Sequence, residues 1–386
     1  MHFYIRKMIF AFICFFLYTV TAFAQAAAPS INAHGAILMD GKTGQVLYEK
    51  NAYKQLAPAS TTKIMTAIIA IESGRLDEKV TVSKNAANTP GSSMHLQEGQ
   101  IITIRELLTG LLMRSGNDSA IAIAETIGGS VDKFVELMNK KASEIGADNT
   151  TFRNPHGLSA PGHKSTAFDL AWITRYAMNN PTFAEIVSTK NTSIDWEDMR
   201  GNEHEQNLKN TNKLLWMLEE ADGVKTGTTN EAGPCLVSSA TKNNQRLIAV
   251  TLHDPSRWQD SQALLEWGFK NFSLFQYANL GDIMGDLSIE NGFSDKFSPI
   301  LAEDATIVIE NGTKDKIEVT VDLPEKIKAP VYQGQKVGEL TLLKDGKKIK
   351  SFDLISGEDI EEKTFIRMFL HQLTSIFKYF SSLGFI

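Results

Sequence analysis

The sequence predicts an α/β domain in which an antiparallel sheet packs against helices, followed by a small all-β domain and a terminal amphipathic helix. Strand-like segments occur at both ends of residues 25–275, with helix-like segments between them, so one sheet can recruit both ends of this domain. Short runs of alternating polarity follow over residues 280–355. We therefore expect an α/β domain at 25–275, an all-β domain at 276–357 and a helix within 358–386.

Composition and charge narrow the functional classes. The chain has 386 residues, of which 42% are hydrophobic and 22% charged, as in ordinary globular proteins. A net charge of −6 argues against a nucleic-acid-binding protein. Cys14 and Cys235 are too few for a disulfide scaffold or a cysteine-ligated zinc site, and we expect Cys235 to be a small buried apolar residue.

Residues 1–24 have the pattern of a secretory signal peptide. A basic start precedes an apolar run, Met8–Val20, and small residues lead to a cleavage point after Ala24. The run is too short to be a comfortable permanent transmembrane helix. The sequence therefore predicts export and a site of action outside the cytoplasm, with an uncleaved N-terminal anchor as the alternative.

Local patterns predict the elements of the first domain. Two short apolar runs, 35–40 and 45–50, flank Gly41-Lys42-Thr43-Gly44 and indicate a hairpin. The helical segments are 58–73, 104–113, 118–127, 131–145 and 259–272. Three strands over 223–254, with turns at 230–234 and 242–244, complete the sheet.

The C-terminal segment is predicted to form an amphipathic helix over 365–386. Its apolar residues recur at the spacing of one helix face: Ile366, Phe369, Leu370, Leu373, Ile376, Phe377, Phe380 and Leu383. If the helix crossed a bilayer, Arg367 and Lys378 would lie in hydrocarbon. We therefore expect an interfacial helix on a membrane surface, with docking on the protein's own body as the alternative.

Three short motifs carry candidate chemistry. In Ser60-Thr61-Thr62-Lys63, residues three apart share a helix face, so the Lys63 amine can lie beside the Ser60 hydroxyl and take its proton if held neutral. Ser115-Gly116-Asn117 lies between two predicted helices. Lys225-Thr226-Gly227 lies on a predicted strand and supplies a second cation. Each is weak alone: the simpler interpretations are an N-capping serine with a solvated lysine, a helix-breaking turn and an exposed edge-strand turn.

Together, the order and context of these motifs resemble those of penicillin-binding proteins and serine β-lactamases. The likeness is closer to the D-alanyl-D-alanine carboxypeptidases, the low-molecular-mass penicillin-binding proteins, and covers nearly the whole mature chain. Family-like stretches are 57–66, 154–158, 210–215, 223–227, 329–331 and 334–338. The resemblance implies a β-lactamase/transpeptidase-like fold, no cofactor or metal, peptidoglycan stem peptides as substrates, β-lactams as inhibitors and a peripheral membrane anchor.

The resemblance also implies roles for the motif residues. Ser60 is similar to the acylated nucleophile, and Lys63 to its base. Ser115 and Lys225 correspond to proton-relay partners, and Asn117 to the amide that orients the substrate.

Further residues are expected to bind the substrate. Thr226 resembles the family's carboxylate-binding threonine. The backbone N–H groups of Ser60 and Thr228 would form the oxyanion hole, with Gly227 allowing close approach. Thr228 stands where the family often has histidine, which leaves a backbone donor intact.

Arg257 is a further carboxylate-binding candidate. The strand ending near His253 should run parallel to the strand that carries Lys225-Thr226-Gly227. The two should lie two strand spacings apart, or roughly 10 Å, and Arg257 follows the second of them. The family likewise has an arginine shortly after this strand. The alternative is a surface arginine paired with Asp254 or Asp260.

Other activities fit the sequence less well. A β-lactamase of class A needs a glutamate-held water, but no E-x-E-L-N-like segment lies between Asn117 and Lys225. A zinc peptidase is disfavoured because His156, His163 and His204 lack H-E-x-x-H spacing. A catalytically idle wall-binding protein is the alternative from another functional class, and the intact motifs argue against it.

Overall fold

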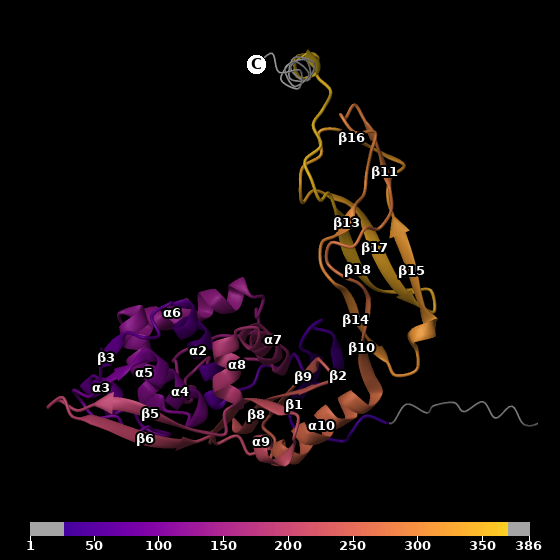
Figure 1. Ribbon diagram of the computed structural model, residues 1–386. Coiled ribbons are helices and arrows are strands. Elements are labelled where there is room, and N and C mark those ends of the chain that lie inside the picture. The colour runs from indigo at the N-terminus through magenta and orange to yellow at the C-terminus, as the bar shows by residue number, and fades with distance from the viewer. Residues whose placement is uncertain (1–26, 370–386) are drawn as a thin grey trace, which may run out of the picture.

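The computed structural model describes residues 27–369, which form a helix-rich unit and an all-β unit that rises from one end of it (Figure 1). The expected signal segment and most of the expected C-terminal helix lie outside the described residues. Figure 1 shows the chain passing from the first unit to the second where α10 (Arg257–Asn271) is followed by β10 (Phe272–Ala278).

The first unit is built on a five-stranded sheet with the strand order β2-β1-β9-β8-β7. Every neighbouring pair in it is antiparallel, so β7 and β9 run parallel to each other, as the sequence predicted. Because β1 pairs with β9, both ends of the unit join one sheet. The strands are β1 (Gly35–Asp40), β2 (Val46–Lys50), β7 (Ala221–Thr229), β8 (Gly233–Lys242) and β9 (Gln245–Leu252).

Helices cover both faces of this sheet because its strands alternate their side chains between two cores. Ile37 and Met39 face the larger core, which contains α2. Leu38 faces a smaller core with Leu264 and Leu265 of α10. The remaining helical segments are η1 (Ala59–Thr62), α2 (Lys63–Glu72), α3 (Lys84–Ala87), α4 (Ile104–Met113), α5 (Asn117–Gly128), α6 (Val131–Glu144), α7 (Ala167–Met178), α8 (Pro181–Ser188) and α9 (Leu214–Met217).

A second, four-stranded sheet flanks the helices and was not predicted. Its order is β3-β4-β5-β6, with bounds β3 (Lys79–Thr81), β4 (Ile101–Thr103), β5 (Asn191–Glu197) and β6 (Glu203–Lys209). The hairpin of β5 and β6 is mostly polar and each strand has one buried residue, Ile194 and Leu208. Each of these strands has too few apolar residues for the alternation of apolar and polar residues that marks a strand to be visible in the sequence.

The second unit is all-β, as expected from its alternating pattern. Its three sheets have the orders β10-β14, β12-β11-β16 and β13-β18-β17-β15. The predicted turn at Asp345-Gly346 joins β17 to β18, and both residues have positive φ, 51° and 71°. The strands after β10 are β11 (Leu287–Glu290), β12 (Lys296–Phe297), β13 (Ile300–Leu301), β14 (Ala305–Glu310), β15 (Ile317–Asp322), β16 (Lys326–Lys328), β17 (Lys336–Lys344) and β18 (Lys347–Ile355), with the short helix η2 (Lys314–Lys316).

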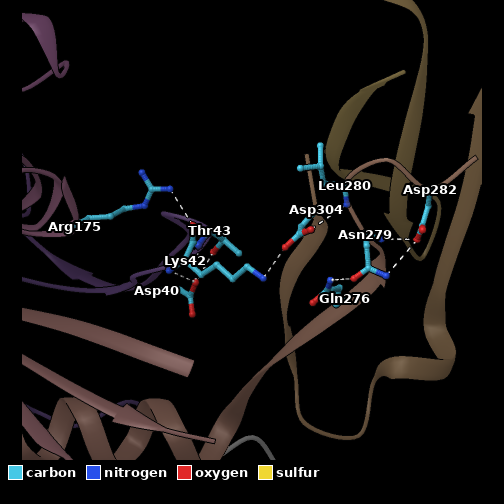
Figure 2. Close-up of polar contacts among 9 residues, drawn as sticks. All are labelled: Asp40, Lys42, Thr43, Arg175, Gln276, Asn279, Leu280, Asp282 and Asp304. Atoms are coloured by element: carbon cyan, nitrogen blue, oxygen red, sulfur yellow. Dashed lines mark hydrogen bonds and ion pairs between the residues drawn. The ribbon is translucent and has the colours of Figure 1, made fainter. Parts of the chain in front are cut away.

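Polar contacts join the two units at the β1–β2 turn (Figure 2). The Lys42 ammonium lies 3.1 Å from the Asp304 carboxylate, which also accepts the Leu280 N–H. Asp40 accepts hydrogen bonds from the backbone and hydroxyl of Thr43 and so fixes the turn that carries Lys42. The β unit is thereby tied to the sheet that carries the motif strand.

The described part of the chain ends in a short helical segment, 365–369. Its apolar side chains are exposed: Phe365 is 81% and Ile366 is 71% accessible. Within residues 27–369, no helix has the length and apolar character needed to cross a membrane.

Candidate active site

The first motif forms the turn that leads into α2. Ser60 lies in the 3₁₀ turn η1, and Lys63 is the first residue of α2. Their spacing places Lys63 Nζ 3.0 Å from Ser60 Oγ, within hydrogen-bond distance. Ser60 itself is half-buried and thus reachable from outside.

The Lys63 amine is fully enclosed by protein. It donates to Asn117 Oδ1 at 2.7 Å and to the backbone carbonyl of His156 at 2.6 Å, and its side chain has no exposed area. Burial, and secondarily the nearby Lys225 ammonium, hold the pKa of Lys63 far below its ordinary value, although Asp118 acts in the opposite direction. The alternative of a solvated lysine is therefore wrong, and the amine is suited to accept a proton.

A loop over 153–165 packs against η1 and α2. Gly157 packs so tightly there that a Cβ on it would lie 1.9 Å from the Ala59 carbonyl oxygen. Thr66 of α2 donates to the Pro155 carbonyl at 2.6 Å. Since the His156 carbonyl also accepts a hydrogen bond from Lys63, this loop holds both η1 and the Lys63 amine in place.

Ser115 and Gly116 of the second motif lie in the connection between α4 and α5, as predicted, whereas Asn117 is already the first residue of α5. Ser115 has a positive φ of 63°, and its buried hydroxyl has no hydrogen-bond partner in the described protein. A buried hydroxyl without a partner is costly unless a ligand or water satisfies it. Asn117 donates to the Pro90 carbonyl, and the neighbouring Asp118 accepts backbone N–H groups of Met94 and Leu96.

The third motif lies on β7, an edge strand of the central sheet. A Cβ on Gly227 would come 2.8 Å from the Ser60 amide nitrogen, so β7 lies directly against η1. Lys225 is buried and donates to the Thr226 carbonyl at 3.1 Å. Burial, with a smaller contribution from Arg257, lowers the pKa of Lys225 to about 7. The hydroxyls of Thr226 and Thr211 lie 3.4 Å apart.

Arg257 reaches the motif strand, as its predicted position implied. Its Nη1 donates to the Gly227 carbonyl at 2.8 Å, to Thr228 Oγ1 at 2.9 Å and to the Cys235 carbonyl at 3.1 Å. The alternative of a surface arginine paired with Asp254 is therefore wrong, because these hydrogen bonds all go to β7 and β8. Cys235 is buried, as expected, and burial raises the pKa of its thiol to about 11.

Sequence reasoning missed several supporting residues. The His156 carbonyl and the Thr211 hydroxyl fall within stretches singled out as family-like, but neither received a role. His163 was considered only as a metal ligand; its Nδ1 accepts the Arg153 N–H, and its Nε2 lies 2.8 Å from Thr62 Oγ1. Burial lowers the pKa of His163 to about 4, so the ring is neutral with its proton on Nε2.

The chain is similar to known proteins over both units. Residues 22–256 match the model of the D-alanyl-D-alanine carboxypeptidase family, and residues 272–362 match the C-terminal domain of penicillin-binding protein 5. The chain is 37% identical to D-alanyl-D-alanine carboxypeptidase DacC of Escherichia coli, over 91% of this chain and 90% of that one. It is 34% identical to DacF of Bacillus subtilis, over 86% and 87%. The crystal structure of penicillin-binding protein 5 from Haemophilus influenzae superposes with a TM-score of 0.78 at 32% identity, covering 87% of this chain and 99% of that one.

Proposed function

This chain belongs to the D-alanyl-D-alanine carboxypeptidase family, and we propose that it removes the terminal D-alanine of peptidoglycan stem pentapeptides through an acyl-enzyme on Ser60. The observation that carries this proposal is the buried Lys63 amine 3.0 Å from the Ser60 hydroxyl, with its pKa held far below the ordinary value. A free serine is a poor nucleophile, and a neutral amine in contact with it supplies the missing base.

In the proposed acylation step, Ser60 Oγ attacks the carbonyl carbon of the penultimate D-alanine while Lys63 takes the hydroxyl proton. The negative charge that develops on the carbonyl oxygen is stabilised by the backbone N–H groups of Ser60 and Thr228. The contact between Gly227 and the Ser60 amide supports this pairing, because Thr228 is the next residue on β7.

In the proposed departure step, the peptide C–N bond breaks and the leaving D-alanine amine receives the proton that Lys63 took from Ser60, relayed through Ser115 and Lys225. The unpartnered Ser115 hydroxyl supports this role, as does the lowering of the pKa of Lys225 to about 7, which allows proton exchange near neutral pH. Asn117 orients the peptide. Water then hydrolyses the Ser60 ester and regenerates the free hydroxyl.

The terminal carboxylate of the substrate is proposed to bind at Thr226 and Arg257. A guanidinium beside the motif strand supplies a charge-assisted partner for a carboxylate. Such recognition favours a free chain end over an internal bond and accounts for carboxypeptidase activity. Because β-lactams carry a comparable carboxylate, we propose that they acylate Ser60 as inhibitors.

The proposal extends to location and organisation. We propose that residues 1–24 direct export, that 25–275 is the catalytic domain and 276–357 the all-β domain, and that the C-terminal segment within 358–386 binds the outer face of the cytoplasmic membrane. The exposed apolar residues Phe365 and Ile366 support the last point.

One experiment separates the candidate activities. The protein is incubated with fluorescent penicillin and, separately, with diacetyl-Lys-D-Ala-D-Ala, and the adduct is located by mass spectrometry. Stable labelling of the Ser60 peptide with release of D-alanine is the expected result. Rapid turnover of the drug would indicate a β-lactamase, and neither reaction would indicate an idle wall-binding protein. An active Ser60→Ala variant would contradict the mechanism.

A further inference from the structure

We infer that Asp254 is a positioning residue for Arg257, which it holds through the turn that leads into α10. The inference rests on the proposed role of Arg257 in binding the substrate carboxylate. It concerns a pair of buried acids that the proposed mechanism does not use.

Hydrogen bonds connect Asp254 to the motif strand in a closed circuit. Its backbone N–H donates to the Pro234 carbonyl at 2.8 Å, and Pro234 lies opposite Thr228 in the sheet. Its Oδ1 accepts the Ser256 N–H at 2.9 Å, and its carbonyl accepts the Arg257 N–H at 3.2 Å. The Arg257 side chain then returns to Thr228 Oγ1 at 2.9 Å. The position of the guanidinium therefore depends on the turn that Asp254 fixes.

The carboxyl group of Asp254 lies in a setting that favours a proton. Asp254 has no exposed area, and its Oδ2 is buried without a hydrogen-bond partner among the described residues. Asp260 is 7% exposed and accepts the Asn32 N–H through Oδ2. Burial first, and Asp260 second, raise the pKa of Asp254 to about 6. A proton on Asp254 removes its repulsion with Asp260.

The protonation of Asp254 should affect how Arg257 binds a carboxylate. When Asp254 is neutral, the substrate carboxylate is the negative group that the Arg257 guanidinium attracts. When Asp254 is ionised, its carboxylate competes with the substrate for the guanidinium. The KM for a peptide with a free carboxylate should therefore rise as the pH increases through about 6. The other titratable groups around this acid pair are Arg257, the Cys235 thiol, His253 with its stacked partner His34, and Tyr48, which faces Asp260.

The test compares kcat/KM for diacetyl-Lys-D-Ala-D-Ala with that for its C-terminal amide at a pH below about 6, where Asp254 is neutral in the wild type and its charge does not enter the comparison. Arg257→Ala should reduce the preference for the free carboxylate by about tenfold. Asp254→Ala should reduce it similarly, because the Ser256 N–H loses its acceptor. Asp254→Asn should restore it, since the amide oxygen keeps an acceptor for the Ser256 N–H. Asp222→Asn is the matched control: Asp222 also has a buried oxygen without a partner, at the opposite end of β7.

The outcomes distinguish this inference from the proposed function. A folded Asp254→Ala with the wild-type preference, or an Asp254→Asn as impaired as the alanine variant, overturns the inference and leaves the role of Arg257 intact. An Arg257→Ala with unchanged preference removes that role and the inference with it. If Asp254→Ala does not fold, the pH profile decides: the KM of Asp254→Asn should stay flat between about pH 5 and 7, where the wild-type KM rises about threefold or more. Identical profiles overturn the inference.

Discussion

At the scale of single residues, the sequence predicts which side chains act but not which backbone atoms hold them. Ser60 and Lys63 could be paired from their spacing because residues three apart share a helix face. The His156 carbonyl, which binds the same amine, could not be assigned, since every residue offers a carbonyl. The burial that lowers the pKa of Lys63 is likewise a property of tertiary packing, and a local motif does not encode it.

Replacing Lys63 with alanine should slow acylation by about 10²–10⁴-fold, the usual contribution of a general base. The physical reason is that Ser60 would lose the only group shown to contact its hydroxyl among the described residues. Stopped-flow labelling with fluorescent penicillin measures the rate, and circular dichroism confirms folding. Lys79→Ala, which changes a surface lysine paired with Glu197, is the control. An unchanged rate in folded Lys63→Ala would mean that another base acts.

The depressed pKa of Lys225 predicts a specific dependence of stability on pH. Its pKa is about 7 in the folded protein and about 10.4 in an unfolded chain, so between these values the unfolded state binds one more proton. Stability should therefore rise with pH, by about 1.4 kcal/mol per pH unit for this group. Urea unfolding of wild type and Lys225→Met at pH values from about 7.5 to 9 measures the difference in slope. Equal slopes would show that the pKa of Lys225 is not lowered in the folded protein.

At the scale of elements, prediction succeeded where the apolar pattern was strong and failed where it was faint. Both bounds of α4 were predicted correctly. Its apolar stripe begins directly after the N-cap Thr103, which forms a capping box with Glu106, and ends before Ser115. The hairpin of β5 and β6 was missed because its residues are mostly polar. The close packing of β7 on η1 could not be seen either, since it joins segments remote in sequence.

Substituting Gly227 with alanine should separate β7 from η1, the turn that carries Ser60. The added Cβ would meet the Ser60 amide at 2.8 Å, so the strand or the turn must shift and the two oxyanion donors lose their alignment. Acylation should slow by about 10²-fold, comparable to the loss of one oxyanion donor. Gly128→Ala is the control, because its Cβ would be equally crowded, 2.8 Å from Phe134, outside the site. It should lower the melting temperature without changing the acylation rate of folded protein; a similar rate loss in both would attribute the effect to general destabilisation.

At the scale of the whole molecule, the two units are joined by contacts that the sequence did not reveal. The Lys42–Asp304 ion pair and the hydrogen bond from the Val308 N–H to Gln45 both connect the β1–β2 turn to the β unit. The hairpin of β1 and β2 and the strands of the β unit could each be predicted locally. How they meet depends on side chains more than two hundred residues apart, and no local pattern encodes such a contact.

The structure also refines where a membrane-release truncation should begin. Ile360 is 5% exposed and belongs to a core cluster of the β unit, and its backbone pairs with that of Val331. The Lys363 N–H donates to the Asn291 carbonyl. Residues up to Lys363 therefore contribute to the folding of the β unit, whereas Phe365 is exposed.

Removing residues 364–386 should release the protein from membranes without affecting acylation, because the apolar pattern of this segment begins beyond the last core contact of the described residues and lies far from Ser60 in sequence. Co-sedimentation with liposomes of mixed anionic and zwitterionic phospholipids measures binding, and fluorescent penicillin measures the active site. Removing 358–386 should also release the protein but lower its melting temperature, since Ile360 leaves its core. A 364–386 deletion that unfolds rather than detaches would instead indicate that the terminal helix docks on the protein's own body.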